Sequence, residues 1–201
     1  TGVDDNIIDG TTTTTITMSI DAASTDDDFD GVADQTVSAA NTDDDVAGFT
    51  IAESSGSTAV SETGTTDTYT VVLDAEPASD VVIDVASDDT GEVTADQSSL
   101  TFTSANWNTP QTVTVTGVDD NILDNTQTAI LTMSINAAST DDDFDGVADQ
   151  TVSVDNSDDD TAVLTINDVA VNEDDGTATV SVTVDIAVTG GFSVDVNTTD
   201  G

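Results

Sequence analysis

The chain has 201 residues, of which 42 are Asp or Glu and none is Lys, Arg or His, so its formal net charge is −42. This charge argues against nucleic acids and anionic membrane surfaces as partners, because both attract Lys and Arg. The absence of cysteine excludes disulfides and thiolate metal sites. Since no basic side chain is present, the charge that balances the carboxylates has to come from outside: sodium, a basic partner or divalent cations.

Catalysis and membrane insertion are not expected from this composition. Without His, Cys or Lys, the common bases that activate nucleophiles are missing. A carboxylate pair could cleave glycosidic bonds, but sugar-cleaving clefts usually present aromatic residues, which make up 3% of this chain. No apolar run approaches the length of a membrane span. We therefore expect neither an enzyme nor a membrane-inserted protein.

The first 45 residues of the chain return later with few changes. The stretch TGVDDNIIDG at residue 1 reappears as TGVDDNILDN at residue 116, an offset of 116 − 1 = 115 residues. A period of this length is that of a whole domain and not of a solenoid unit. We expect a window of a longer tandem array, with the C-terminal part of a first repeat (1–45), one complete repeat (46–160) and the N-terminal part of a third (161–201).

Two features of the first repeat allow more than one interpretation. The run GTTTTTITM (10–18) is either an exposed strand face or a site of O-linked glycosylation. The stretch DDDFDGVAD contains Asp26, Asp28, Asp30 and Gly31, the D-x-D-x-D-G start of a calcium loop, with Asp34 at the ninth position. The second copy of this stretch supplies Asp141, Asp143, Asp145 and Asp149.

Position twelve of this loop is Val37, where calcium loops usually carry a bidentate Glu, and no flanking helix is predicted. Without helices the spacing resembles the calcium loops of thrombospondin type 3 repeats. A calcium loop and a plain acidic insertion between two strands remain alternatives for both copies.

The complete repeat alternates apolar and polar residues with period two, which is typical of half-buried strands, and no segment shows helical periodicity. The predicted inward residues are Phe49, Ile51, Tyr69, Val71, Leu73, Val81, Ile83, Val85, Leu100, Phe102, Val113, Val115, Ala129, Leu131, Met133, Ile135, Val152 and Val154. They form about seven strands, the number in an immunoglobulin-like sandwich. The predicted fold class is all-β, with tandem immunoglobulin-like antiparallel β-sandwiches.

Two residues outside this pattern bear on recognition. Trp107 is predicted to be a packing anchor at a loop, with a carbohydrate platform as the alternative, and Asn197 begins a match to the N-glycosylation signal.

Several segments resemble the Calx-beta repeat, a calcium-binding sandwich of the sodium–calcium exchanger and integrin β4 type. Residues 164–201, LTINDVAVNEDDGTATVSVTVDIAVTGGFSVDVNTTDG, are similar to its opening, VDDNILDN (118–125) to its paired-Asp loop, and the triplet 158–160 to its acidic end. The segment SLTFTSANWNTPQTVTVTGVDDN (99–121) is also similar to tandem repeats of large bacterial surface proteins and adhesins. The chain departs from the family at Asp124, where Glu is usual, and at SETG (61–64), a loose Glu-Gly opening.

The resemblance implies a calcium site where the complete sandwich meets the next repeat. Its ligands would come from Glu62, Asp89, Asp119, Asp120, Asp124, Asp158, Asp159 and Asp160. The first repeat supplies the matching Asp4, Asp5, Asp9, Asp43, Asp44 and Asp45, and the third supplies Glu173, with Asp200 as a further candidate. Calcium takes six to eight oxygen ligands, whereas zinc favours the His and Cys that are absent. We expect several calcium ions; solubilising surface loops are the alternative.

The predicted function is a structural repeat segment of an extracellular, calcium-rigidified bacterial fibre or adhesin stalk at the cell surface. Its partners would be neighbouring repeats or copies of itself. One alternative is an adhesion module that binds carbohydrate or another cell. The other is a filament subunit that assembles by exchanging strands between neighbours.

Overall fold

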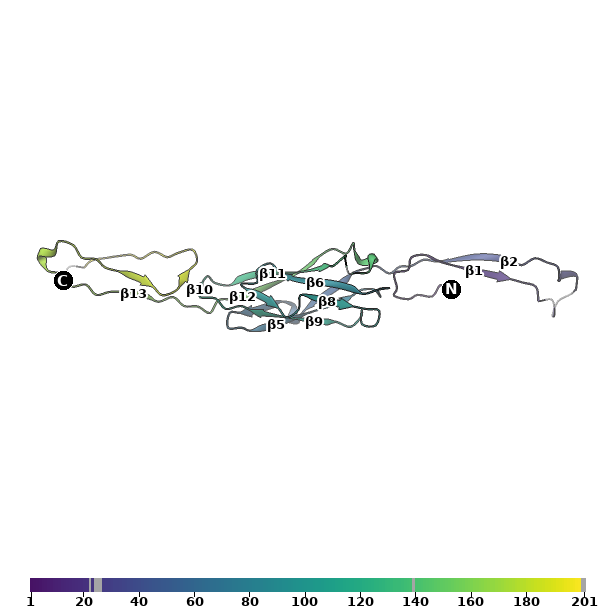
Figure 1. The fold of residues 1–201 in the computed structure, drawn as a ribbon, viewed down its shortest axis with the longest axis horizontal. Coiled ribbons are helices and arrows are strands. Elements are labelled where there is room, and N and C mark those ends of the chain that lie inside the picture. The colour runs from purple at the N-terminus through teal and green to yellow at the C-terminus, as the bar shows by residue number, and fades with distance from the viewer. Residues whose placement is uncertain (22, 24–26, 139, 200–201) are drawn as a thin grey trace.

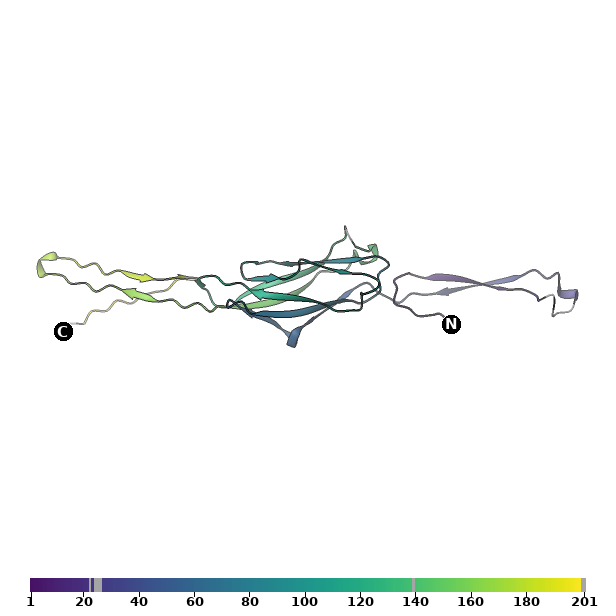
Figure 2. The same ribbon diagram turned by 60° about the horizontal axis from the view of Figure 1, so that its bottom comes forward.

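A computed structural model describes residues 1–21, 23, 27–138 and 140–199. The molecule is elongated, with a sandwich of strands in the middle and a narrow hairpin extending from each end (Figures 1 and 2). We call residues 1–45 the N-terminal arm and residues 161–199 the C-terminal arm. In the part of the chain that is described, no helix is long and apolar enough to cross a membrane.

The central sandwich consists of two sheets. The five-stranded sheet has the order β4 (Thr58–Ser61), β12 (Gln150–Ser157), β11 (Gln127–Ile135), β6 (Val81–Ser87) and β8 (Ser99–Phe102). The four-stranded sheet has the order β3 (Phe49–Glu53), β5 (Thr66–Leu73), β9 (Gln111–Gly117) and β7 (Val93–Ala95). A 3-10 turn, η2 (Ser54–Gly56), lies between β3 and β4. The predicted all-β antiparallel class is confirmed.

The core lies between the two sheets and follows the period-two pattern of the sequence. Every predicted inward residue is buried except Ile51 and Ile135, which are half-buried. Trp107 is half-buried and packs against this core, so its predicted packing role is confirmed. Tyr69 donates its hydroxyl to the Met133 sulfur at 3.3 Å, across the two sheets.

The described sandwich has nine strands where the sequence predicted about seven. The additional strands are β4 (TAVS), in which the apolar Ala59 and Val60 are adjacent and do not alternate, and β7, which has only three residues. β4 also pairs in parallel with β12, whereas the other pairs of the two sheets are antiparallel.

Each arm contains a two-stranded antiparallel hairpin. The N-terminal arm has β1 (Thr12–Met18), η1 (Asp27–Phe29) and β2 (Gln35–Asn41). The C-terminal arm has β13 (Leu164–Ile166), η4 (Glu173–Asp175), β14 (Val182–Val184) and β15 (Ala187–Val188). β1 and β2 are the counterparts of β11 and β12 at an offset of 115 residues, but no second sheet faces them in the described structure. Met18 is therefore 54% exposed, whereas Met133 is fully buried.

The same junction joins the sandwich to both arms. On the C-terminal side, β10 (Ile122–Leu123) pairs in parallel with β15, Ile122 opposite Ala187. On the N-terminal side, Ile7 forms a parallel bridge with Glu76. Ile7 and Ile122 are separated by the 115-residue offset between the first and second repeats. Glu76 and Ala187 are separated by 111 residues, the same offset that relates Glu62 of the second repeat to its counterpart Glu173 of the third. The repeats therefore dock in one register, with a four-residue deletion in the third repeat.

Candidate metal centre

Carboxylates from five separate loops converge at the end of the sandwich that adjoins the C-terminal arm. Glu62 follows β4, Asp119 and Asp120 follow β9, Asp124 follows β10, and Asp159 and Asp160 follow β12. Glu92, from the loop before β7, also belongs to this cluster of carboxylates. Each sits where a strand ends, so the sheet order and not sequence proximity brings them together.

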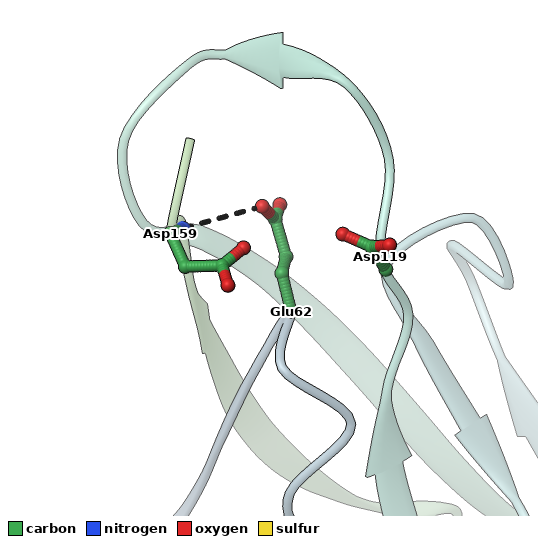
Figure 3. Close-up of side chains that lie close together, drawn as sticks. All are labelled: Glu62, Asp119 and Asp159. Atoms are coloured by element: carbon green, nitrogen blue, oxygen red, sulfur yellow. Dashed lines mark hydrogen bonds between the residues drawn. The ribbon is translucent and has the colours of Figure 1, made fainter. Parts of the chain in front are cut away.

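Three groups of these side chains have ligand oxygens that lie within 4.8 Å of one another. They are Glu62 with Asp119 and Asp159, Glu62 with Asp120 and Asp160, and Glu92 with Asp120 and Asp124. Figure 3 shows the first group, whose carboxylates gather above the strand ends. Because Glu62 and Asp120 each belong to two groups, the three groups form one continuous site.

Glu62 is the most deeply buried carboxylate of this site, at 2% exposure. Its Oε2 accepts the backbone N–H of Asp159 at 3.5 Å, the contact drawn in Figure 3. Burial raises its pKa to about 7, an effect that the hydrogen bond from Asp159 opposes and that the charges of Asp158, Asp120 and Asp124 increase. A cation beside Glu62 would remove both the desolvation penalty and the repulsion.

Asp158 shapes the loops of the site. Its Oδ2 accepts the backbone N–H groups of Asp124 and Asn125 at 2.9 and 2.8 Å, and its Oδ1 accepts that of Asp160 at 2.7 Å. The pKa of Asp158 is lowered, mainly by the hydrogen bond from the Asp160 N–H. Burial opposes this effect, and the hydrogen bonds from Asn125 and Asp124 lower the pKa further. Asp158 thus holds the two loops together and lies outside the three oxygen groups.

Two carboxylate oxygens at this end are buried without a hydrogen-bond partner among the described residues. They are Asp124 Oδ1 and Asp160 Oδ2. Burial raises the pKa of Asp160, followed in effect by repulsion from Asp158, Asp159, Asp119 and Asp120. A buried acceptor without a donor is costly, and the sequence has no Lys, Arg or His to supply one. The arrangement is therefore suited to a hard cation that takes oxygen ligands.

Glu92 is a candidate ligand that the sequence did not indicate. Its Oε2 accepts a hydrogen bond from the buried Asn156 Nδ2 at 3.0 Å, which fixes its position beside Asp120 and Asp124. Asp89, which the resemblance did indicate, is outside the three groups: its Oδ1 accepts the Gly91 N–H, and its carbonyl accepts those of Glu92 and Val93. The sequence could have indicated Glu92 only through its position in the same loop as Asp89, between β6 and β7.

The acidic residues of the N-terminal arm form a second, more open version of this site. Asp43 accepts the N–H groups of Asp9, Gly10 and Asp45, which match those of Asp124, Asn125 and Asp160 around Asp158. Asp4, Asp5, Asp9, Asp43, Asp44 and Asp45 all line a cavity of about 360 Å³. Burial, then repulsion from Asp43, Asp44, Asp4 and Asp5, raises the pKa of Asp45.

Among the described residues, the third-repeat candidate Glu173 belongs neither to the carboxylate site of the sandwich nor to the acidic cavity of the N-terminal arm. Glu173 begins η4, between β13 and β14 in the C-terminal arm. Asp200 lies outside the described residues.

The D-x-D-x-D-G stretches form 3-10 turns. In the second copy, η3 (Asp142–Phe144) is capped by the buried Asp141, whose Oδ1 accepts the Asp143 N–H and whose Oδ2 accepts the Ser79 N–H and hydroxyl. Burial raises the pKa of Asp141, but these hydrogen bonds outweigh it and the pKa is lowered. Asp143, Asp145 and Asp149 are exposed, and none of the three oxygen groups found among the described residues contains them.

The first copy resembles the second in its described part. Asp28 lies in η1, and Asp28, Asp30 and Asp34 are exposed. Asp26, the counterpart of Asp141, lies outside the described residues. The carboxylate that caps the turn in the second copy is held by the sandwich through Ser79, which indicates a structural role for Asp141.

No protein-family model matches the sequence, and no curated protein matches it. Among solved structures, the chain is similar to the apo form of the Calx CBD1 domain, at 14% identity and TM-score 0.40 over 56% of this chain and 98% of that one. It is also similar to domains 1–6 of the surface layer protein SbsC, at 20% identity and TM-score 0.37 over 66% of this chain and 16% of that one. SSP-19, an MSP-domain protein like family member of Caenorhabditis elegans, has 18% identity and TM-score 0.34 over 51% of this chain and 92% of its own. At such identities and scores these likenesses carry no conclusion about function.

Proposed function

We propose that the chain is a structural repeat segment of an extracellular fibre or adhesin stalk at a bacterial cell surface, and that calcium rigidifies it at the junctions between repeats. The observation that carries the proposal is the convergence of Glu62, Glu92, Asp119, Asp120, Asp124, Asp159 and Asp160 beside the junction formed by β10 and β15. The segment 118–125 consists of the loop with Asp119 and Asp120, the strand β10 and Asp124 after it, so one segment serves both the carboxylate site and the contact with the next repeat.

Calcium fits the donor set better than other common metals. All candidate ligands are oxygens, and calcium takes six to eight of them in flexible geometry. Magnesium is smaller, demands a near-octahedral arrangement and usually keeps several waters. The buried oxygens of Asp124 and Asp160 lack donors among the described residues, which supports a cation that these loops enclose.

The energetics suit an extracellular setting. Extracellular modules bind calcium with dissociation constants of about 10⁻⁴–10⁻³ M, so at millimolar calcium each site stabilises the folded state by on the order of 1 kcal/mol or more. Neutralising the charge of −42 would take 42/2 = 21 divalent ions, so most carboxylates stay solvated. The chain has no cysteine, and calcium in this proposal does the stabilising work that disulfides do in many secreted domains.

Thermal unfolding with calcium and with EDTA tests the proposal. We expect a melting temperature several degrees higher in millimolar calcium, and a smaller effect of magnesium at the same concentration. Asp120→Asn should remove most of the shift, because Asp120 belongs to two of the oxygen groups. Asp155→Asn is the matched control, since Asp155 lies on β12 and accepts only the Thr128 hydroxyl among the described contacts. Equal melting temperatures with calcium and EDTA would refute the proposal.

A further inference from the structure

The segment that contains β10 contributes no residue to the core. None of residues 118–125 is buried, whereas buried residues alternate along β9 before it and β11 after it. Asp158 accepts the backbone N–H of Asp124 at 2.9 Å, and the Leu123 carbonyl accepts the Thr189 N–H of the C-terminal arm at 3.0 Å. β10 lies where the sandwich meets that arm (Figure 1). Polar contacts and charges, more than packing, therefore determine the order of β10.

A carboxylate lies on each side of β10. Asp120 precedes the strand and Asp124 follows it, and their oxygens lie within 4.8 Å of each other and of a Glu92 oxygen. We call Glu92, Asp120 and Asp124 the Glu92 group. Like charges so close repel one another, and the sequence has no basic side chain to oppose the repulsion. Without a cation the group disfavours this position of β10, and with one it binds both ends of β10 to Glu92.

A closed set of hydrogen bonds anchors Glu92 to the sandwich. Asn156 of β12 is 1% exposed, and its Nδ2 donates to Glu92 Oε2 at 3.0 Å and to the Val118 carbonyl at 3.1 Å. The Val118 N–H in turn donates to the Glu92 carbonyl at 2.8 Å. Asn156 thus joins the end of β12, the loop before β7 and the residue after β9, and none of these bonds involves β10.

The first repeat forms part of the same set. Asn41, the counterpart of Asn156 at the 115-residue offset, donates from Nδ2 to the carbonyl of Val3, the counterpart of Val118, at 3.0 Å. No glutamate lines the cavity beside Asn41. The bond to the carbonyl therefore forms without a glutamate, and a substitution at Glu92 should leave Asn156 in place.

The two groups that contain Glu62 have a different position. Glu62 follows β4, Asp159 and Asp160 follow β12, and these two strands already pair in the five-stranded sheet. A cation there strengthens a contact that the sheet makes by itself. Of the three groups found among the described residues, only the Glu92 group contains both carboxylates that flank β10.

We propose that a cation held by the Glu92 group fixes β10 and so controls the contact with the next repeat, and that Asn156 is the residue that positions Glu92 for this cation. The inference rests on the proposed function for the identity of the cation, calcium. It adds a division of roles: the groups with Glu62 stabilise the sandwich, and the Glu92 group couples calcium to the junction.

Amide hydrogen exchange followed by NMR tests the coupling, because the Thr189 N–H is bonded to β10. In about 10 mM calcium chloride this amide should exchange about 10–100-fold more slowly than in EDTA, as dissociation constants of about 10⁻⁴–10⁻³ M imply. The amides of β11, a central strand of its sheet, serve as the reference for global unfolding.

Glu92→Gln should remove most of this slowing. The amide of Gln still accepts the hydrogen bond from Asn156, so stability in EDTA should not fall. Glu53→Gln, which lies outside the three oxygen groups, is the matched control and should keep the slowing. Equal slowing of Thr189 exchange in Glu92→Gln and in the unmodified chain would overturn the proposal.

Asn156→Ala tests the positioning role. It should lower stability in EDTA, because the Val118 carbonyl loses its donor, and it should also remove the slowing of Thr189 exchange by calcium. Asn136→Ala is the matched control: Asn136 Nδ2 donates to Asp84 at 3.0 Å outside the oxygen groups, so this variant should lose stability and keep the slowing. Asn156→Leu, of similar size, repeats the test without a large cavity. Slowing that persists in both Asn156 variants would show a purely structural role.

Melting temperatures separate this inference from the proposed function. If calcium raises the melting temperature of the unmodified chain but slows Thr189 exchange equally in Glu92→Gln, the calcium proposal stands and this inference fails. If calcium leaves the melting temperature unchanged, the proposed function fails and this inference fails with it.

Discussion

Gly117 leaves room for the buried Asn156, whose Oδ1 lies 2.6 Å from the point where a Cβ at residue 117 would stand. The Ser61 carbonyl oxygen is closer still, at 2.2 Å. Asn156 in turn donates to Glu92 Oε2 and to the Val118 carbonyl. A residue without a side chain therefore lets the loops of the metal centre pack against the end of β9.

Gly117→Ala should destabilise the sandwich by about 1–3 kcal/mol, the usual cost of forcing extra atoms into a packed site. Both close neighbours are backbone or a buried amide, so neither moves easily. Gly146→Ala is the matched control, because a Cβ there meets no atom within 4 Å and the residue has no positive φ. Urea denaturation of both variants measures the difference, and equal midpoints would contradict the packing argument.

Phe144→Ala should cost about 3–5 kcal/mol, whereas Phe29→Ala should change the stability of dilute protein by less than about 0.5 kcal/mol. The two residues occupy the same place in the repeat, but Phe144 is fully buried and Phe29 is 56% exposed. Chemical denaturation at low protein concentration tests this pair. A comparable loss for both would mean that the N-terminal arm is packed in solution.

The stability of the calcium-free protein should depend on Glu62. Its pKa is about 7 in the folded state and 4.5 ordinarily, so between these values the folded state holds a proton that the unfolded state has released. The free energy of unfolding should therefore fall as pH rises from about 4.5 to about 7, by on the order of 2 kcal/mol.

Glu62→Gln should remove this component of the pH dependence and raise the melting temperature in EDTA at pH 8. Glu53→Gln, at a half-buried Glu that accepts the Thr58 hydroxyl, should keep the profile of the unmodified protein. In calcium the order reverses, because Glu62→Gln removes a charged ligand. An unchanged pH profile in Glu62→Gln would show that Glu62 is not the group that titrates.

Asp158→Asn should weaken calcium binding by about 10–100-fold, as loss of groups that orient metal ligands usually does. An amide has one acceptor oxygen where the carboxylate has two, and Asp158 accepts three backbone N–H groups through both. Isothermal titration with calcium measures the affinity, with Asp155→Asn as the control. Affinity equal to that of the control would mean that the loops hold their shape without Asp158.

Much of the fold follows from local sequence. The alternation of apolar residues in Tyr69, Val71 and Leu73, and in the other strands, places side chains on one face of a strand whatever its neighbours are. The 115-residue repeat predicted one complete repeat over residues 46–160, and the absence of basic residues indicates that the balancing charge is external. These properties depend on spacing and composition alone.

The resemblance implied that eight carboxylates converge at this end, and only the tertiary structure decided which of them bring their ligand oxygens together. Glu62 and Asp159 are 97 residues apart and meet because β4 and β12 are neighbours in one sheet. The structure also added Glu92, assigned Asp158 to loop geometry and assigned Asp141 to a turn cap. The physical reason is that strand order and register determine which strand ends meet. A local pattern determines only which face of a strand is buried, and the counterparts Met18 and Met133 differ, the first exposed and the second buried.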